Sequence, residues 1–208
     1  MTELEKQTEE KIFEAATEVF IEKGMDGARM QEIADRAGIN KALLHYYYRS
    51  KEKLFDAVFT IIAKQMLKRF APVFDEKLTL EEKIRFYYQQ QTDFMKRSPR
   101  LPLFILNEVS RNPQRVKNVI KHMDHNSLLK LLMEQHSDEF ARYNINPETL
   151  PQIMTSIAAI SIFPFVAKPI IEGIFEKFGT NFNEYIENRV DFATAFTYDA
   201  IISREVKP

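Results

Sequence analysis

Cysteine is absent from the 208 residues of the chain, which excludes disulfide bonds and thiolate metal sites and favours a reducing compartment. Glycine and proline are few, at five and nine residues, and they lie between stretches of helical periodicity. No alternating apolar stretch is typical of a strand. Catalytic signatures are missing too: there is no nucleophile elbow, no glycine-rich phosphate loop and no H-E-x-x-H motif. The sequence therefore predicts an all-α protein that is not an enzyme.

Net charge and long apolar runs are also limited. A net charge of −1 means that any binding to nucleic acid must be local, because the whole chain has no excess of cations. Residues 1–11 are charged and lack the apolar core of a signal peptide. The run from Ile153 to Phe175 carries Lys168, Glu172 and two prolines, so we interpret it as a buried helix pair. We expect a cytoplasmic protein without membrane contact.

Residues 30–54 contain the pattern from which function can be argued. A short helix with an apolar stripe is predicted from Met30, Ile33, Ala34 and Ala37. Gly38 can take the positive φ of a sharp turn, and Asn40 is a good N-cap for a second helix. The predicted buried side of that second helix consists of Leu43, Leu44, Tyr47 and Tyr48. Two short amphipathic helices joined by such a turn form a helix-turn-helix, whose second helix enters the DNA major groove.

The outward side chains of the second helix suit base edges. We predict base contacts from Asn40, Lys41, Ala42, His45 and Tyr46, and phosphate contacts from Arg29, Gln31, Tyr47 and Lys51. Residues 29–53 hold six Lys or Arg against three Asp or Glu, whereas residues 1–28 hold three against eight. The positive charge is therefore confined to the helix-turn-helix, as expected for one face presented to double-stranded DNA.

This stretch resembles the DNA-binding domain of the TetR family of transcriptional regulators. The matching residues are Ile33-Ala34, Ala37-Gly38-Ile39-Asn40, Ala42-Leu43-Leu44-His45, Tyr47-Tyr48, Lys51-Glu52 and Leu54, preceded by Ile12, Ala15, Ala16, Phe20 and Gly24. Three positions depart from the family pattern. Arg29 replaces a capping Thr or Ser, Leu43 replaces a Thr that often contacts the DNA backbone, and His45 replaces a Tyr. These departures put single contacts in doubt and leave the motif intact.

The rest of the chain is predicted to be helical. Helices are expected from Thr8 to Lys23, from Ser50 to about Phe70, from Thr79 to about Arg97, from Pro113 to about Phe140, from Pro147 with bends at Pro164 and Pro169, and from Phe182 to Ser203. The helix after Ser50 is too long for a three-helix head, so it must bridge into a second unit. We predict a helix-turn-helix DNA-binding domain at residues 6–67, including the start of this long helix, and a helical ligand-binding and dimerisation domain at 68–205.

The last two long helices are more apolar than one core requires. The resemblance implies a homodimer in which these helices pair across a two-fold axis as a four-helix bundle. The predicted interface residues are Ile153, Ile157, Ile160, Val190, Ala193 and Phe196. Two heads held about one helical turn, roughly 34 Å, apart would read a palindromic operator. The alternative is that these side chains form the core of a monomer.

The central region combines aromatic side chains with a few polar ones. An apolar cavity with orienting groups is predicted from Tyr87, Gln90, Phe94, Phe104, Asn107, His122 and Phe163. By the resemblance, a small-molecule effector binds here and the bridging helix transmits the change to the heads, so that a repressor leaves its operator. Ordinary core packing is the alternative for each of these residues.

Other functional classes stay open. His122 and His125 lie three residues apart, but no third ligand is placed, so neither a metal nor any cofactor is predicted. A DNA-bound interaction protein without an effector is the main alternative. An enzyme would need a titratable pair in the cavity, for which His122 or His125 with Glu108 is the nearby candidate.

Overall fold

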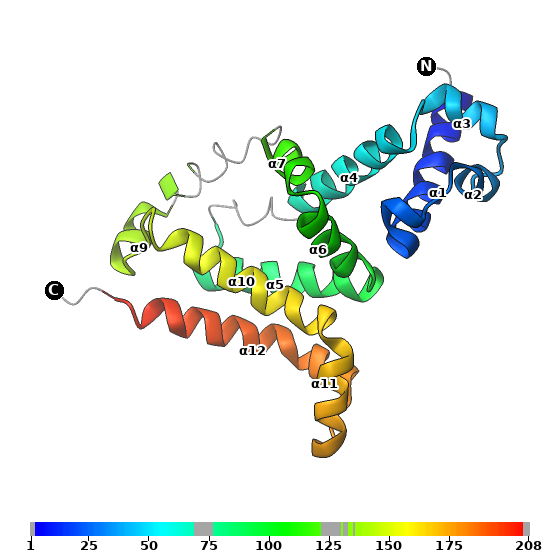
Figure 1. Cartoon of the computed structure of the whole chain (residues 1–208). Helices are drawn as coiled ribbons and strands as arrows, with labels where there is room; N and C mark the ends of the chain where they lie inside the picture. The colour runs from blue at the N-terminus through cyan, green and yellow to red at the C-terminus, as the bar shows by residue number, and fades with distance from the viewer. Residues whose placement is uncertain (1–2, 69–76, 122–129, 131–132, 135, 206–208) are drawn as a thin grey trace. The chain divides into compact units, whose positions relative to one another are not determined.

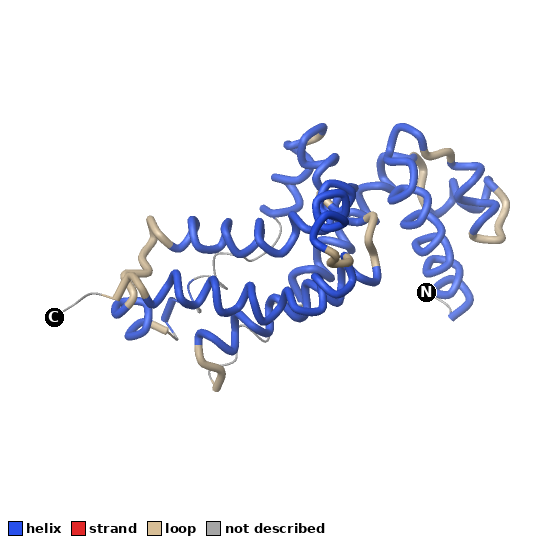
Figure 2. Tube along the Cα trace, turned by 90° about the horizontal axis from the view of Figure 1, so that it is seen from below, coloured by secondary structure: helices blue, strands red, loops and turns tan. Residues whose placement is uncertain are grey.

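The computed structural model describes residues 3–68, 77–121, 130, 133–134 and 136–205. Every regular element among these residues is a helix (Figure 2), which confirms the all-α prediction. Packing divides the chain into two compact units, Met1–Met66 with Leu103–Met123, and Leu67–Pro102 with Asp124–Pro208. The domain boundaries at 6–67 and 68–205 concern function and stay a prediction.

The first three helices of the first unit are α1 (Glu3–Gly27), α2 (Met30–Arg36) and α3 (Lys41–Tyr47), as Figure 1 shows. Helix α1 begins earlier than the predicted Thr8, with Glu3 and Glu5 in the first turn, where acidic side chains interact favourably with the helix dipole. Its helical geometry breaks at Gly24, which has φ +67°, before one further turn. Glycine tolerates this conformation without a Cβ clash, so the predicted end of the helix is confirmed.

Helices α4 (Lys51–Lys68), α6 (Leu101–Arg111) and α7 (Pro113–Lys121) belong to the same unit. Phe55 of α4 is fully buried and meets Phe20 of α1 edge-on, with ring centroids 4.9 Å apart. Phe104 of α6 packs on the other side, 5.7 Å from Phe55 and 6.2 Å from Phe59. These aromatic contacts join α4 to both α1 and α6.

The second unit contains α5 (Leu80–Arg97), α9 (Ser137–Arg142), α10 (Leu150–Val166), α11 (Lys168–Phe175) and α12 (Phe182–Ile202). Helix α5 begins with a capping box: the Thr79 hydroxyl accepts from the Glu82 amide, and the Glu82 carboxylate accepts from the Thr79 amide. Helices α10 and α12 both pack on α5 (Figure 1). Tyr88 of α5 lies within this core, and its hydroxyl is 2.7 Å from that of Thr197 on α12.

The helical region that begins near residue 147 bends close to Pro164 and Pro169, as predicted. Helix α10 gives way to α11 and the 3-10 turn Glu176–Phe178 at an angle of 73°. Pro164 lies inside α10 and Pro169 in the first turn of α11. Within the described residues no single helix is long and apolar enough to span a membrane, although this bent pair meets the length and composition criteria together.

The predicted buried helix pair is buried only in part. The pair leaves several large apolar side chains in solvent, because few elements pack against its outer face: Phe163, Ile170, Ile174 and Phe178. The helix predicted from Pro113 to about Phe140 is described only as far as Lys121. Phe140 itself lies in the separate short helix α9.

Candidate nucleic-acid interface

The turn between α2 and α3 has the geometry that the sequence predicts. Gly38 adopts φ +67°, and the Ile39 amide donates to the Ala34 carbonyl oxygen at 3.0 Å. The Asn40 side chain accepts from the Leu43 amide at 2.8 Å and so caps α3. Arg29 precedes α2 without a side-chain cap hydrogen bond, as its departure from the family pattern implies. The local sequence thus fixes the angle between the two helices.

A small apolar core holds α3 in place. Leu44 is fully buried, together with Ile33 and Ala34 of α2 and the inner face of α1. Leu43 was predicted to share this buried side, and that prediction is wrong because its side chain is 36% exposed. Neighbouring residues on a helix point about 100° apart, so a seven-residue helix resting on Leu44 turns Leu43 outward.

The outer face of α3 carries the predicted base-reading residues. Asn40, Lys41, Ala42 and His45 are exposed, and Tyr46 is 76% exposed. The neighbouring tyrosines are partly buried and bind α1: the Tyr47 hydroxyl donates to the Glu5 carbonyl oxygen at 3.4 Å, and the Tyr48 hydroxyl donates to the Glu9 carboxylate at 3.3 Å. The five side chains that the sequence assigns to base edges are therefore all exposed.

Salt bridges within the protein engage some of the cations near the helix-turn-helix. The Arg36 guanidinium pairs with Glu22 at 2.8 Å and Glu32 at 3.0 Å, and Glu18 lies 3.6 Å away. Its hydrogen bonds to Glu22 raise the pKa of Arg36 above its ordinary value. Lys23 pairs with Glu32 at 2.6 Å, and this hydrogen bond lowers the pKa of Glu32. Arg36 and Lys23 are thus neutralised within the protein.

The other cations of the helix-turn-helix differ in their contacts. Lys51 is half-buried, and its ammonium group donates to the carbonyl oxygens of Ala28 at 3.1 Å and Asp26 at 3.4 Å. No ion pair within the described part of the chain engages the exposed cations Arg29, Lys41, Arg49 and Lys53. The side chain of Gln31 donates to Asp35 at 2.8 Å. Exposed cations therefore flank the base-reading face of α3.

The residues predicted to bind an effector are spread over both units. Tyr87, Gln90, Phe94 and Phe163 belong to the second unit, and Phe104 and Asn107 belong to the first. The Tyr87 hydroxyl is 3.2 Å from that of Ser161, whereas Phe163 is 62% exposed. His122 lies outside the described residues. The effector site therefore stays a prediction.

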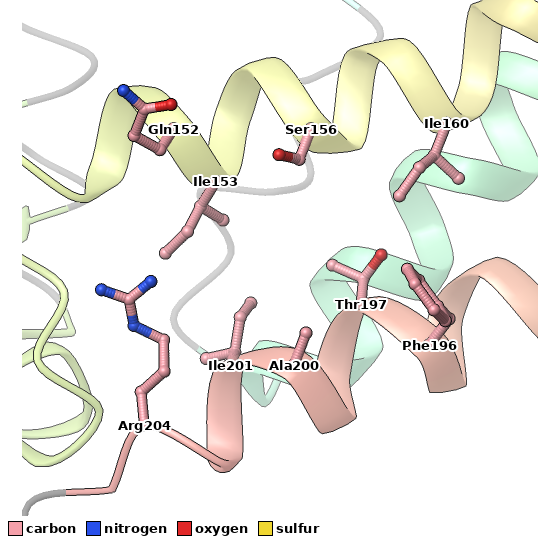
Figure 3. Close-up of a pocket in the computed structure, with 9 residues that line it drawn as sticks. All are labelled: Gln152, Ile153, Ser156, Ile160, Phe196, Thr197, Ala200, Ile201 and Arg204. Carbon is pink, nitrogen blue, oxygen red and sulfur yellow. The ribbon is translucent and has the colours of Figure 1, made fainter.

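A groove of about 220 Å³ lies between α10 and α12 in the second unit (Figure 3). It is lined by Gln152, Ile153, Ser156, Ile160, Phe196, Thr197, Ala200, Ile201 and Arg204. Three of these, Ile153, Ile160 and Phe196, are predicted interface residues. The polar lining residues and Arg204 give no sequence signal of their own, because a groove arises only when two distant helices come together.

Two predicted interface residues lie elsewhere. Val190 is 8% exposed and Ala193 is fully buried, because both point from α12 toward α5 and pack in the core of their own unit. The outer face of α12 instead presents Phe192 and Phe196, which are 60% and 57% exposed and stack with centroids 6.0 Å apart. Their spacing of four residues was the signal from which Phe192 could have been predicted.

Residues 12–58 match the family model described as bacterial regulatory proteins of the tetR family. These residues form a DNA-binding domain of the tetR family type. It is similar to the HTH-type transcriptional regulator YhgD of Bacillus subtilis, with 26% identity over 79% of this chain and 91% of that one. The HTH-type transcriptional repressor NicS of Pseudomonas putida is 29% identical over 43% of this chain and 45% of its own length.

The similarity in fold extends over most of the chain. The crystal structure of the putative transcriptional regulator SCO4942 from Streptomyces coelicolor covers 93% of this chain and 97% of its own, with a TM-score of 0.68 and 17% identity. The match includes both the N-terminal helix-turn-helix and the C-terminal helical region, so both parts share the fold of that structure. The chain is a DNA-binding transcriptional regulator.

Proposed function

We propose that the chain is a homodimeric repressor that binds a palindromic operator in the cytoplasm. The observation that carries the proposal is the accessible face of α3, where Lys41, His45 and Tyr46 stand out from a helix anchored by the buried Leu44. Base edges are read by Asn40, Lys41, Ala42, His45 and Tyr46, and phosphates are bound by Arg29, Gln31, Tyr47 and Lys51. No catalytic activity is assigned.

The dimer face proposed here is the outer side of α10 and α12. Phe196 lines the groove of Figure 3, the exposed Phe192 stacks on Phe196, and Phe163 of α10 is exposed as well. A surface that carries both projecting rings and a groove can complement a second copy of itself across a two-fold axis. Ile153 and Ile160 line the same groove, and these two and Ile157 are partly buried against the core of their own unit.

We also propose a small, largely apolar effector that releases the protein from DNA. Support comes from α5, where Gln91 and Thr92 are 5% exposed among large apolar side chains such as Phe94. Buried polar groups in apolar surroundings suit the orientation of a small ligand. The effector must favour the dimer form whose heads do not match the operator.

Selection of bound duplexes from a random pool, at two salt concentrations, tests the DNA-binding proposal. A palindromic consensus is expected from the wild type. Lys41→Ala is expected to change the consensus, with a loss of about 1 to 3 kcal/mol per base contact. Lys11→Ala, a change at an exposed lysine of α1, serves as the control and should leave it unchanged. The absence of any consensus from the wild type would refute the proposal that the protein binds a palindromic operator.

A DNA-bound interaction protein without an effector is the alternative. Screening compounds for release of the protein from the selected operator separates the two functions. Release by a compound that also raises the melting temperature of the protein supports the effector. If no compound releases the DNA while a protein partner is recruited to the complex, the alternative is supported.

A further inference from the structure

Arg115 has an unusual place in its helix. It is the third residue of α7, which begins at Pro113. The first turn of a helix is the positive end of its dipole, so a cation is locally unfavourable there. A residue that opposes the local preference of its element points to a contact made elsewhere in the fold.

The guanidinium of Arg115 binds side chains from three other helices of the first unit. Its Nε lies 2.7 Å from the Asp56 carboxylate of α4, and its Nη1 lies 2.5 Å from the Glu108 carboxylate of α6. Nη1 also lies 3.4 Å from the sulfur of Met25 in α1. The guanidinium carbon stands 4.9 Å from the centroid of the Phe55 ring, a cation–π contact.

Because the Glu108 and Arg115 side chains are largely buried, breaking their ion pair is costly. The Glu108 side chain is only 6% exposed, and that of Arg115 is 20% exposed. A buried carboxylate is costly when it loses its counter-ion, so Glu108 and Arg115 hold each other in place. The guanidinium is a rigid planar fork, and its edges toward Asp56 and Glu108 cannot move independently. A shift of α6 relative to α4 therefore breaks at least one of the two ion pairs.

The contacts of Arg115 lie beside the DNA-reading helix in the chain. Helix α4 begins four residues after α3 ends, and Met25 precedes the carbonyl oxygens of Asp26 and Ala28 that bind Lys51. Arg115 thus touches the segments on both sides of the helix-turn-helix, although it lies far from it in sequence.

We propose that Arg115 is a positioning residue that fixes α1 and α4 to α6 and α7 and so sets the orientation of the DNA-reading head. It acts through Asp56, Glu108 and Met25 and contacts no DNA. The inference rests on the proposed operator binding.

The test compares variants that distinguish loss of the Arg115 ion pairs from a general loss of folding. Arg115→Met leaves Glu108 buried and unpaired, so the combined variant Arg115→Met with Glu108→Gln removes both charges together. Arg111→Met is the matched control, because its ion pair with Asp26 at 3.3 Å joins side chains that are 69% and 87% exposed. Arg115 is not a phosphate contact, so the salt dependence of DNA binding should stay as in the wild type.

The decisive readout is a distance distribution within the first unit. Because the chain has no cysteine, spin labels can be placed at Glu14→Cys of α1 and Ser110→Cys of α6, both exposed, with labelled chains diluted in unlabelled protein. We expect a narrow distribution for the wild type and for Arg111→Met. The combined variant should unfold cooperatively, show a broad or shifted distribution and bind the selected operator about tenfold more weakly.

An unchanged distribution in the combined variant would overturn the proposal, even if DNA binding weakened. So would an equal effect of Arg111→Met. If the random-pool selection yields no operator, the proposed function fails, and the distance distribution alone then decides the role of Arg115.

Discussion

The ammonium nitrogen of Lys51 lies 3.1 Å from the carbonyl oxygen of Ala28. This hydrogen bond ties the first residue of α4 to the link between α1 and α2, beside the reading helix. An ammonium group has three N–H donors, so the contacts to Ala28 and Asp26 leave one donor for a DNA phosphate. The sequence assigns Lys51 to DNA, and the structure adds a role in holding the head together.

Replacement of Lys51 by alanine should therefore have two effects. The affinity for all DNA sequences should fall alike, and the slope of log affinity against log salt should decrease by about one. Loss of the bonds to the two carbonyl oxygens should lower the free energy of unfolding by about 1 kcal/mol. Binding titrations at several salt concentrations and thermal melts measure the two effects. An unchanged salt slope would remove Lys51 from the phosphate contacts.

Leu44 and Leu43 form a matched pair for testing the core beneath the reading helix. Leu44→Ala should cost about 2 to 5 kcal/mol of stability, because its side chain is fully buried. Leu43→Ala should stay within about 0.5 kcal/mol, since its side chain lies at the surface. Chemical denaturation of both variants provides the values. Equal losses would mean that Leu43 is packed as tightly as its neighbour.

The capping box of α5 predicts a dependence of stability on acid. The hydrogen bond from the Thr79 amide lowers the pKa of Glu82 below its ordinary value of 4.5. A carboxylate whose pKa is lower in the folded state stabilises the fold above the unfolded pKa, and this stabilisation is lost as the pH falls through the folded pKa. The wild type should have a higher melting temperature than Glu82→Gln at neutral pH, and this difference should shrink as the pH falls through the lowered pKa of Glu82. The exposed Glu81→Gln is the control, and a difference that persists in acid would contradict the assignment.

Phe196 on the outer face of α12 provides a test of the dimer. Phe196→Glu should weaken self-association by about thirtyfold or more, since a carboxylate would be buried in an apolar interface. Phe178→Glu is the control, because Phe178 is 75% exposed but lies outside α10 and α12. Sedimentation velocity over a range of concentrations gives the dissociation constants. If only Phe178→Glu became monomeric, the dimer interface would lie around Phe178 and not on the outer face of α12.

The head could be predicted closely from the sequence because its signals are local. Gly38 and Asn40 act within a few residues, and each has the predicted geometry. Helical periodicity also predicts which helices are apolar. It does not distinguish a face that packs on the same chain from one that packs on a second copy. For this reason Val190 and Ala193 were assigned to an interface although they pack against α5.

Long-range ion pairs had no signal in the sequence. Arg115 is 59 residues from Asp56 in the chain, and nothing in the composition of either segment pairs them. The exposed apolar residues of α11 were likewise predicted as buried, because apolar content alone does not reveal how many neighbours an element has. Residues brought together by tertiary packing therefore had to come from the structure.

The glutamates around Arg36 affect how the protein searches a genome. With Glu18, Glu22 and Glu32 around its guanidinium, Arg36 is engaged inside the protein when the head meets a phosphate backbone. A head with fewer available cations binds random DNA weakly and stays on each wrong site for a shorter time. If α3 reads an operator as proposed, the time spent on non-cognate sequence is reduced, and discrimination between the operator and other DNA depends more on the side chains of α3.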